Sequence, residues 1–364
     1  MAVLLAVMGL QNRKISVWLI FLVLIAFITA SLYAFWWNTG LIYFYTANIC
    51  VALLVASVAS NRELDKTVSV GSAIVLIIVL GAWIAFYLKL SGVGPATIFV
   101  TAGGREIPFY YTALAHDLWT PFGADMVRVS GIYDEPGTLS FVICLFAFFR
   151  HTKGMNKRFT WTILLLGFVT FSLAHLIYSF IHFISELSSR KKVLQIFFLG
   201  IVGIAVLSQT VIFQYIDYAL VARLSISGDS DKIVQGDNRS NRFFQDWSNL
   251  KDADLKGLVF GYGDSSVNKS QGKEDVVSAG ENPLVFLVSL GIFASWPYYL
   301  FLLFAIGVGA TNKNYLPLLG VGLLFMQRPA VMRSGYAMLA AMTIIIVLRD
   351  PAIKRIYRKL VPRH

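Results

Sequence analysis

The residues best suited to chemistry lie in the ten-residue stretch 128–137, which holds one cation and two adjacent carboxylates. Arg128 offers a planar fork of donors that matches phosphate and carboxylate groups. Glu135 precedes Pro136, and proline at a first helical position predicts a helix that begins there with Glu135 as its N-cap. A helix N-terminus also favours a nearby carboxylate or bound phosphate. The stretch therefore predicts either a functional carboxylate at an anion site or a capped helix, with Arg128 paired to Glu135 or to lipid headgroups.

A second concentration of charge is the turn that Arg328 and Arg333 flank, in a connector predicted to face outside. Short outer connectors normally avoid Lys and Arg. Two arginines there predict contact with an anionic ligand close to a membrane; the alternative is anchoring to outer-leaflet headgroups. The arginines predicted on the outer side are Arg105, Arg128, Arg223, Arg239, Arg242, Arg328 and Arg333.

The composition shows what must position these residues. Of 364 residues, 57% are hydrophobic and only 14% charged, which is typical of a polytopic membrane protein and excludes water-soluble classes. The net charge of +11 lies in short connectors and the tail rather than in a basic soluble domain, so we expect no nucleic-acid partner. Cys50 and Cys144 lie inside apolar runs, where buried packing is the simplest role.

The apolar runs predict an all-helical (all-α) fold with about ten transmembrane helices and both termini in the cytoplasm. More than half of the 31 basic residues then fall in cytoplasmic connectors or the tail, as the positive-inside rule requires. Stretch 159–187 fits two short helices or one bent helix, and two are preferred because one would place Arg190 to Lys192 outside. The predicted spans are 16–36, 40–60, 67–88, 136–150, 159–172, 173–187, 193–213, 283–307, 315–327 and 335–348.

Three regions follow from this pattern. Residues 1–213 form an N-terminal transmembrane bundle that includes a segment at 90–135, whose apolar pieces are too short to span and are expected to be re-entrant or interfacial. Residues 214–282 form one large outer loop. Residues 283–364 form the closing helices and a basic cytoplasmic tail suited to anionic lipid.

The large loop contains one clear helical signal. Phe243, Trp247 and Leu250 recur at helical intervals, which predicts an amphipathic helix lying on the membrane. Gly257 is expected to end this helix, and 261–263 to form a turn.

Other polar patterns favour no site. Two Asp-x-Asp pairs, at 229–231 and 252–254, resemble the metal clip of nucleotide-sugar enzymes, but both lie outside and are expected to be solvated. The five histidines show no metal-ligand spacing, so no metal or other cofactor is predicted. His175 and His182 share one span, where they either pack or line a cavity.

Three motifs follow one another along the chain: Arg128-x-Ser130-Gly131-x-x-x-Glu135-Pro136, then Asn241-Arg242-Phe243-x-x-x-Trp247 with Leu258-x-x-Gly261-x-Gly263, and Glu281-Asn282-Pro283-Leu284 leading into Leu290-Gly291-Ile292. In this order they resemble motifs of the Wzy-type O-antigen and exopolysaccharide polymerases and, more distantly, of the O-antigen ligases. The ligases usually have histidine before the asparagine of the third motif, where this chain has Glu281, and this difference disfavours a ligase.

The resemblance implies a metal-independent glycosyltransferase of the bacterial inner membrane with its site facing the periplasm, acting in lipopolysaccharide biosynthesis. It would transfer a growing glycan from undecaprenyl diphosphate onto the non-reducing end of a second lipid-linked repeat. Implied partners are these lipid-linked oligosaccharides, membrane lipids, a chain-length regulator and a flippase. On this hypothesis Arg242, Arg328 and Arg333 hold the diphosphate and Glu135 is the base, which makes these four the catalytic residues. The substrate-binding set is Arg128, Arg239, Glu281 (also the second-choice base) and Tyr336.

Two other functions remain open. An O-antigen ligase would use the same donor but deliver the glycan to lipid A–core. A transporter or flippase of an anionic lipid-linked substrate would also place arginines near the membrane boundary, although no paired halves are evident in the spans.

Overall fold

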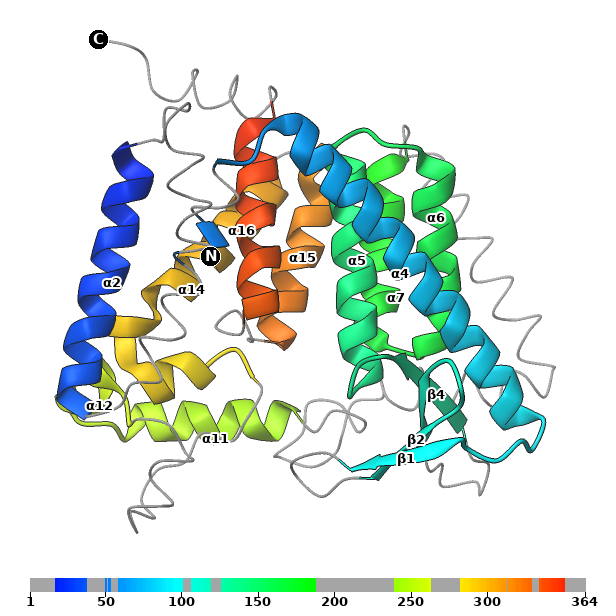
Figure 1. Cartoon of the computed structure of the whole chain (residues 1–364). Helices are drawn as coiled ribbons and strands as arrows, with labels where there is room; N and C mark the ends of the chain where they lie inside the picture. Colours follow the sequence, from blue (N-terminus) through cyan, green and yellow to red (C-terminus); the bar gives the residue numbers. More distant parts are fainter. Residues whose placement is uncertain are drawn as a thin grey trace.

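The computed structural model is mainly helical, with one small sheet (Figure 1). It describes residues 17–37, 50, 52–53, 58–100, 106–118, 126–187, 239–262, 282–311, 313–328 and 334–350. The helices are α2 (Val17–Trp37), α4 (Asn61–Leu90), α5 (Pro136–Thr152), α6 (Lys157–Leu166), η1 (Gly167–Thr170), α7 (Leu173–Glu186), α11 (Arg239–Lys251), α12 (Leu255–Phe260), α14 (Val285–Thr311), η3 (Lys313–Tyr315), α15 (Leu316–Gln327) and α16 (Ser334–Arg349).

Apart from α11 and α12, which lie in the predicted loop, the described α-helices overlap predicted apolar runs, because a helix satisfies the backbone of an apolar run within the run itself. Within the described residues, α4 and α14 are long and apolar enough to cross a membrane. The run at 193–213 and most of the run at 40–60 lie outside the described residues. The count of ten spans therefore stays a prediction.

The stretch 159–187 forms two helices, as preferred from the charge pattern. Helix α6 continues into the 3-10 turn η1, and the chain then reverses at Phe171, whose φ of 44° is left-handed. The following residues begin α7. The reversal brings the start of α6 to the end of α7, where the Trp161 indole donates to the Glu186 carboxylate at 3.0 Å.

The segment 90–135 contains a four-stranded antiparallel sheet, and its predicted re-entrant or interfacial location stays a prediction. Its strands are β1 (Thr97–Val100), β2 (Glu106–Phe109), β3 (Leu114–Leu118) and β4 (Met126–Gly131), in that order across the sheet. Short runs with β-branched and aromatic residues can satisfy their backbone by pairing with one another, and this removes the need for helices. The sheet is the one departure from helix among the described elements.

Helix α5 is the centre of the bundle, and Figure 1 shows it among α4, α6, α7, α15 and α16. Apolar residues line nearly all of its circumference, and Leu139, Ile143 and Phe148 are fully buried. A helix that is apolar all round is stable only where it is covered on every side. Strand β4 runs into α5 through Gly131, whose φ is 64° and where an added Cβ would lie 2.6 Å from the Ile78 side chain.

The loop helix forms as α11, and whether it lies on a membrane stays a prediction. Leu250 is buried and Phe243 half-buried, whereas Trp247 is 57% exposed and Asp246 is fully buried. The Asp246 carboxylate accepts a 2.7 Å hydrogen bond from Asn282, just before α14. A polar anchor therefore decides which face of α11 is covered.

Gly257 does not end the loop helix, as the sequence had suggested. Helix α11 ends at Lys251, and Gly257 lies inside α12, where its amide donates to the capping carboxylate of Asp254 at 2.7 Å. Gly261 ends α12 with a left-handed φ of 71°, and the predicted turn at 261–263 stays a prediction because Gly263 lies outside the described residues. An added Cβ on Gly261 would lie 2.5 Å from the backbone nitrogen of Gly291, the kink of α14, so the glycines of the second and third motifs lie backbone to backbone.

Candidate functional site

The central contact of the candidate site joins Arg328 and Glu135, which are 193 residues apart in the chain. One guanidinium nitrogen of Arg328 pairs with the Glu135 carboxylate. The Arg328 side chain is only 7% exposed, whereas that of Glu135 is 41% exposed. The guanidinium of Arg328 is therefore fixed by the groups around it, whereas the carboxylate of Glu135 remains partly accessible to solvent.

The N-terminus of α5 is shaped to receive this guanidinium. A second nitrogen of Arg328 donates to the Thr138 hydroxyl at 2.9 Å. A Cβ on Gly137 would lie 2.7 Å from a guanidinium nitrogen, so the absent side chain leaves the space that Arg328 occupies. A cation beside the positive end of a helix is unfavourable by itself, and the Glu135 carboxylate offsets this repulsion.

Glu135 is the N-cap residue, with Pro136 after it, as predicted. Its side chain makes no capping hydrogen bond to the helix. Glu135 was predicted either to cap the helix or to act as a functional carboxylate. Its backbone does start the helix, but its carboxylate binds Arg328 instead of capping. A carboxylate has about four lone-pair positions, so it can accept from more than one donor.

A pocket of about 600 Å³ opens at this ion pair, between α5 and α16. The part of its lining around Glu135, here called the mouth, is polar, with acidic, tyrosine and arginine side chains. The part further along α5, from Val142 to Phe146 and roughly 6 Å long, is apolar and is here called the floor. The lining residues are Tyr133, Asp134, Glu135, Thr138, Val142, Phe146, Arg328, Gly335, Tyr336 and Leu339.

Two tyrosines stand at the pocket mouth. Tyr336 was predicted to bind substrate, and its ring lies against Phe141 of α5 with the ring centroids 4.9 Å apart. Tyr133 belongs to the turn before α5, where burial and the neighbouring Tyr336 raise the pKa of its phenol. Tyr133 therefore stays protonated at neutral pH, and a phenol O–H can donate to a sugar or phosphate oxygen.

The remaining predicted site residues are placed elsewhere or lie outside the described part. Arg128 lies on β4, where its Nε donates to the Thr170 carbonyl at 3.2 Å. Arg242 is half-buried on α11. Neither lines the pocket, so their roles stay predictions. Arg333, Glu281 and the Arg239 side chain lie outside the described residues.

Sequence reasoning missed several residues that shape the pocket. Gly137 and Thr138 follow Pro136 directly, but nothing in their spacing indicates that an arginine from α15 would lie over them. Tyr133 and Asp134 lie inside the stretch that was singled out, yet carried no role. The pairing of α5 with the end of α15 is a long-range contact, and local patterns do not encode it.

Comparisons of the chain with protein-family models, with curated proteins and with solved structures found no match. Its function is therefore argued from this geometry and its sequence motifs.

Proposed function

We propose that this chain is a membrane polysaccharide polymerase that transfers a growing glycan from undecaprenyl diphosphate onto a second lipid-linked repeat at the periplasmic face of a bacterial inner membrane. The observation that carries this proposal is the buried Arg328 paired with the more exposed Glu135 at the mouth of a pocket. These two residues were selected independently from the sequence, one as a phosphate ligand and one as a base.

The two-part lining of the pocket supports a lipid-linked substrate. Val142, Phe146 and Leu339 form an apolar floor between α5 and α16, suited to part of a prenyl chain. Arg328 and the tyrosines lie at the polar mouth, where a diphosphate would follow directly on the prenyl chain. A ligand with an apolar chain and an anionic headgroup matches this combination of apolar floor and polar mouth better than a soluble anion does.

The proposed step exchanges the partners of Arg328. Diphosphate oxygens of the donor replace the Glu135 carboxylate at the guanidinium, and the released carboxylate takes the proton of the acceptor hydroxyl. The acceptor oxygen then bonds to the anomeric carbon as the bond from that carbon to the diphosphate oxygen breaks. Undecaprenyl diphosphate leaves with its electron pair, and the fixed charge of Arg328 stabilises the negative charge that develops.

The test is reconstitution of purified protein in lipid with a synthetic undecaprenyl-diphosphate-linked repeat, read as a glycan ladder. We expect wild-type protein to make the ladder, and Glu135→Gln and Arg328→Gln to lose at least 100-fold in rate, because each removes a group that acts on a reacting atom. Arg158→Gln, an exposed arginine at the start of α6, is the matched control and should keep full activity.

Other outcomes would redirect the assignment. Transfer only when lipid A–core is supplied as acceptor would indicate a ligase. Absence of any glycosidic product, with labelled lipid-linked repeat crossing the bilayer, would indicate a transporter. Full ladders from both variants would remove the Arg328–Glu135 pair from the chemistry.

A further inference from the structure

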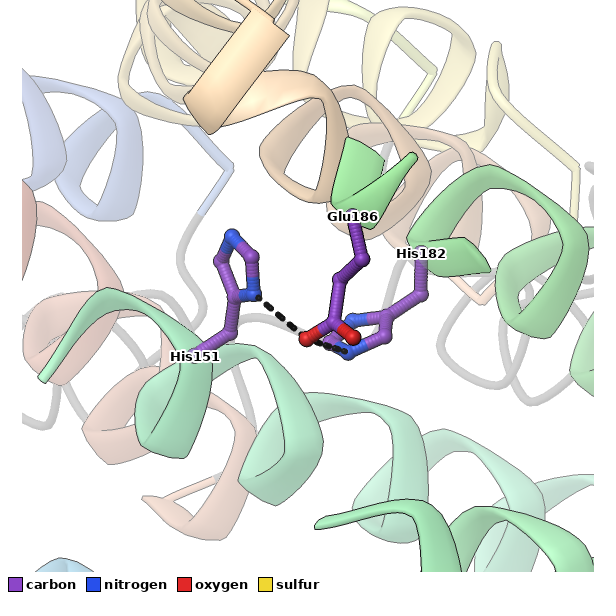
Figure 2. A group of neighbouring side chains, drawn as sticks. All are labelled: His151, His182 and Glu186. Atoms are coloured by element: carbon purple, nitrogen blue, oxygen red, sulfur yellow. Dashed lines mark ion pairs between the residues drawn. The ribbon is translucent and has the colours of Figure 1, made fainter. Parts of the chain in front are cut away.

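A second polar cluster lies at the opposite end of α5 from the pocket. His151 in the last turn of α5 meets His182 and Glu186 of α7, and Figure 2 shows both imidazoles turned toward the carboxylate. His151 lies sixteen positions after Glu135, roughly 24 Å along the helix. None of the three side chains lines the pocket, which reaches along α5 only to Phe146, so the cluster is separate from the proposed catalytic pair.

The three side chains have the spacing of metal ligands. One Glu186 carboxylate oxygen, Oε1, lies 3.7 Å from His151 Nδ1 and 3.8 Å from His182 Nε2. One ligand atom from each residue can be chosen so that all three lie within 4.8 Å of one another. Two ligands about 2.1 Å from one tetrahedral ion stand roughly 3.4 Å apart, so a small side-chain movement would close the site.

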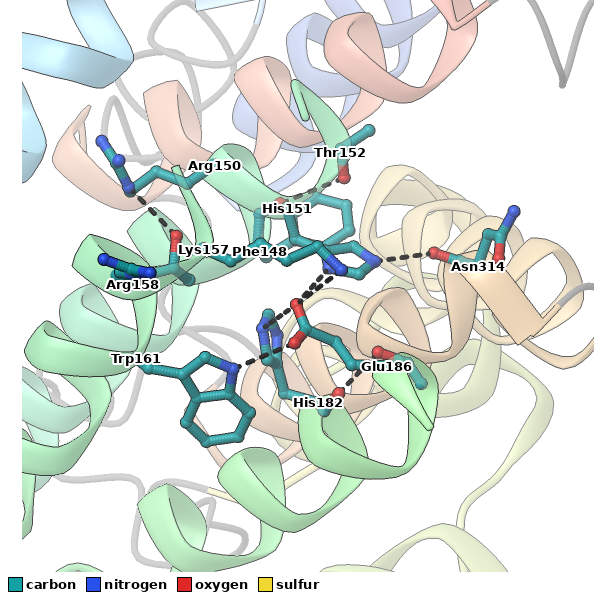
Figure 3. Close-up of polar contacts among 12 residues, drawn as sticks. Phe148, Arg150, His151, Thr152, Lys157, Arg158, Trp161, His182, Glu186 and Asn314 are labelled. Carbon is teal, nitrogen blue, oxygen red and sulfur yellow. Dashed lines mark hydrogen bonds and ion pairs between the residues drawn. The ribbon is translucent and has the colours of Figure 1, made fainter. Parts of the chain in front are cut away.

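The hydrogen bonds around the cluster orient it for a cation. His151 Nε2 lies 3.2 Å from the Asn314 carbonyl, which can only accept, so Nε2 carries the proton. In a neutral imidazole, Nδ1 then presents a lone pair to the Glu186 carboxylate. The indole of Trp161 donates to the other carboxylate oxygen, Oε2, at 3.0 Å, which leaves Oε1 facing the histidines (Figure 3). Outer partners of this kind typically hold metal ligands in position.

His182 provides the independent observation. Its side chain is 0% exposed, and neither ring nitrogen has a hydrogen-bond partner among the described residues. An imidazole always has polar nitrogens to satisfy, and burying them without partners is costly. A cation between His182 Nε2, His151 Nδ1 and Glu186 Oε1 would satisfy the lone pairs of both rings and the charge of the carboxylate together.

We propose that His151, His182 and Glu186 bind one divalent transition-metal ion of the zinc class, which cross-links the end of α5 to α7. Two imidazole nitrogens and one carboxylate oxygen suit Zn²⁺ and leave a fourth position for water. Lys157 would compete with a metal ion for Glu186, because its Nζ lies 3.7 Å from Glu186 Oε1. Its side chain is 71% exposed, so it can move into solvent when a metal ion binds. Among the described residues, two other cations near the cluster have their own partners: Arg150 binds Thr160 and the Asn156 carbonyl, and Lys153 pairs with Asp65.

The experiment uses full-length protein in detergent, purified without a polyhistidine tag and stripped with chelator. Zn²⁺ affinity is measured by competition with a chromophoric chelator, and Co²⁺ is added as a spectroscopic probe of the ligand set. We expect one tight equivalent of Zn²⁺ in wild type, and at least a 10-fold loss of affinity in His151→Gln and in Glu186→Gln. Loss of an outer partner alone commonly costs 10- to 100-fold, so loss of a ligand should cost no less.

Two further variants sharpen the test. Asp65→Asn removes an exposed carboxylate from the neighbouring Lys153 pair and should leave Zn²⁺ affinity unchanged. Lys157→Gln removes the competing cation and should raise the affinity. The proposal is overturned if wild type retains no equivalent of Zn²⁺, or if His151→Gln and Glu186→Gln bind as tightly as wild type. Neither result depends on glycan transfer.

Discussion

Arg328 and Glu135 show how two residues can depend on each other for both stability and function. The arginine is almost fully buried, so loss of its counter-charge leaves a poorly solvated cation at the positive end of α5. The cost is reduced below that of a fully buried pair because Glu135 is 41% exposed and water screens it.

We therefore predict that Glu135→Gln lowers the free energy of unfolding by about 1–3 kcal/mol, less than the loss typical of fully buried pairs. A double-mutant cycle with Arg328→Met, followed by unfolding in detergent, should give a coupling energy of about 1–3 kcal/mol. Additive effects of the two substitutions would show that the ion pair contributes nothing to stability.

A substitution at Gly137 would displace the guanidinium of Arg328 while leaving both Arg328 and Glu135 unchanged. In Gly137→Ala the new methyl group would lie 2.7 Å from a nitrogen of Arg328, so the side chain must shift. Because small misplacements of a reacting group are costly, we expect a roughly 10- to 100-fold lower rate of glycan transfer with the chain still folded. Gly307→Ala in α14, where nothing lies within 4 Å of an added Cβ, is the control and should transfer at the wild-type rate.

At the scale of elements, α11 is attached to the start of α14 by a short polar link. The Asn282 side chain donates to Asp246 and accepts from the Leu284 amide at 2.8 Å, so one residue both anchors α11 and shapes the entry to α14. Both functions need an amide that offers a donor and an acceptor, which explains why a polar residue is buried here.

Asn282→Leu should release this link. Asp246 would lose its buried amide donor, at a cost of about 1–3 kcal/mol. Hydrogen exchange should then speed up in the amides of α11 while those of α5 keep their protection. Gln245→Ala, on the exposed side of α11, serves as the control. Unchanged exchange in Asn282→Leu would mean that apolar contacts alone hold α11.

At the scale of the whole molecule, the two ends of the bundle differ in character. One end carries the sheet and α11 (Figure 1), and the Glu135 pocket lies at this end because Glu135 precedes α5 where β4 runs into it. The other joins the end of α5 to the start of α4 through Lys153 and Asp65, and the end of α16 to the residue pair before α4 through Arg349 and Ala59. The described basic residues near these contacts belong to connectors predicted to be cytoplasmic, and their side of the membrane stays a prediction.

This polarity predicts opposite accessibility for two positions that α5 separates. Asp134→Cys at the pocket mouth should react with a membrane-impermeant maleimide in spheroplasts, whereas Lys157→Cys should react only after permeabilisation. The native Cys50 and Cys144 are buried and should give little background. Labelling of both positions from one side would contradict the proposed membrane topology.

The sequence by itself determined the apolar composition, the positions of the described helices in the apolar runs, the start of α5 at Pro136 and the choice of Arg328, Glu135 and Tyr336. These features depend on local patterns: apolar runs, a helix-starting proline and charge where a membrane normally excludes it. The sheet was missed because its short strands are satisfied only by one another. The predicted end of the loop helix at Gly257 was wrong because Asp254 caps a separate helix, α12, that contains Gly257.

Only the tertiary structure decided which predicted residues meet. Packing of α15 and α16 on α5 places Arg328 over Gly137 and Thr138 and encloses the pocket, while Arg128 remains on the sheet. The same packing gathers His151, His182 and Glu186, whose spacing along the chain gave no metal signal because the ligands come from two helices. The physical reason is the same in both cases: a side chain's chemistry is local, but its partners are set by which helices share a buried face.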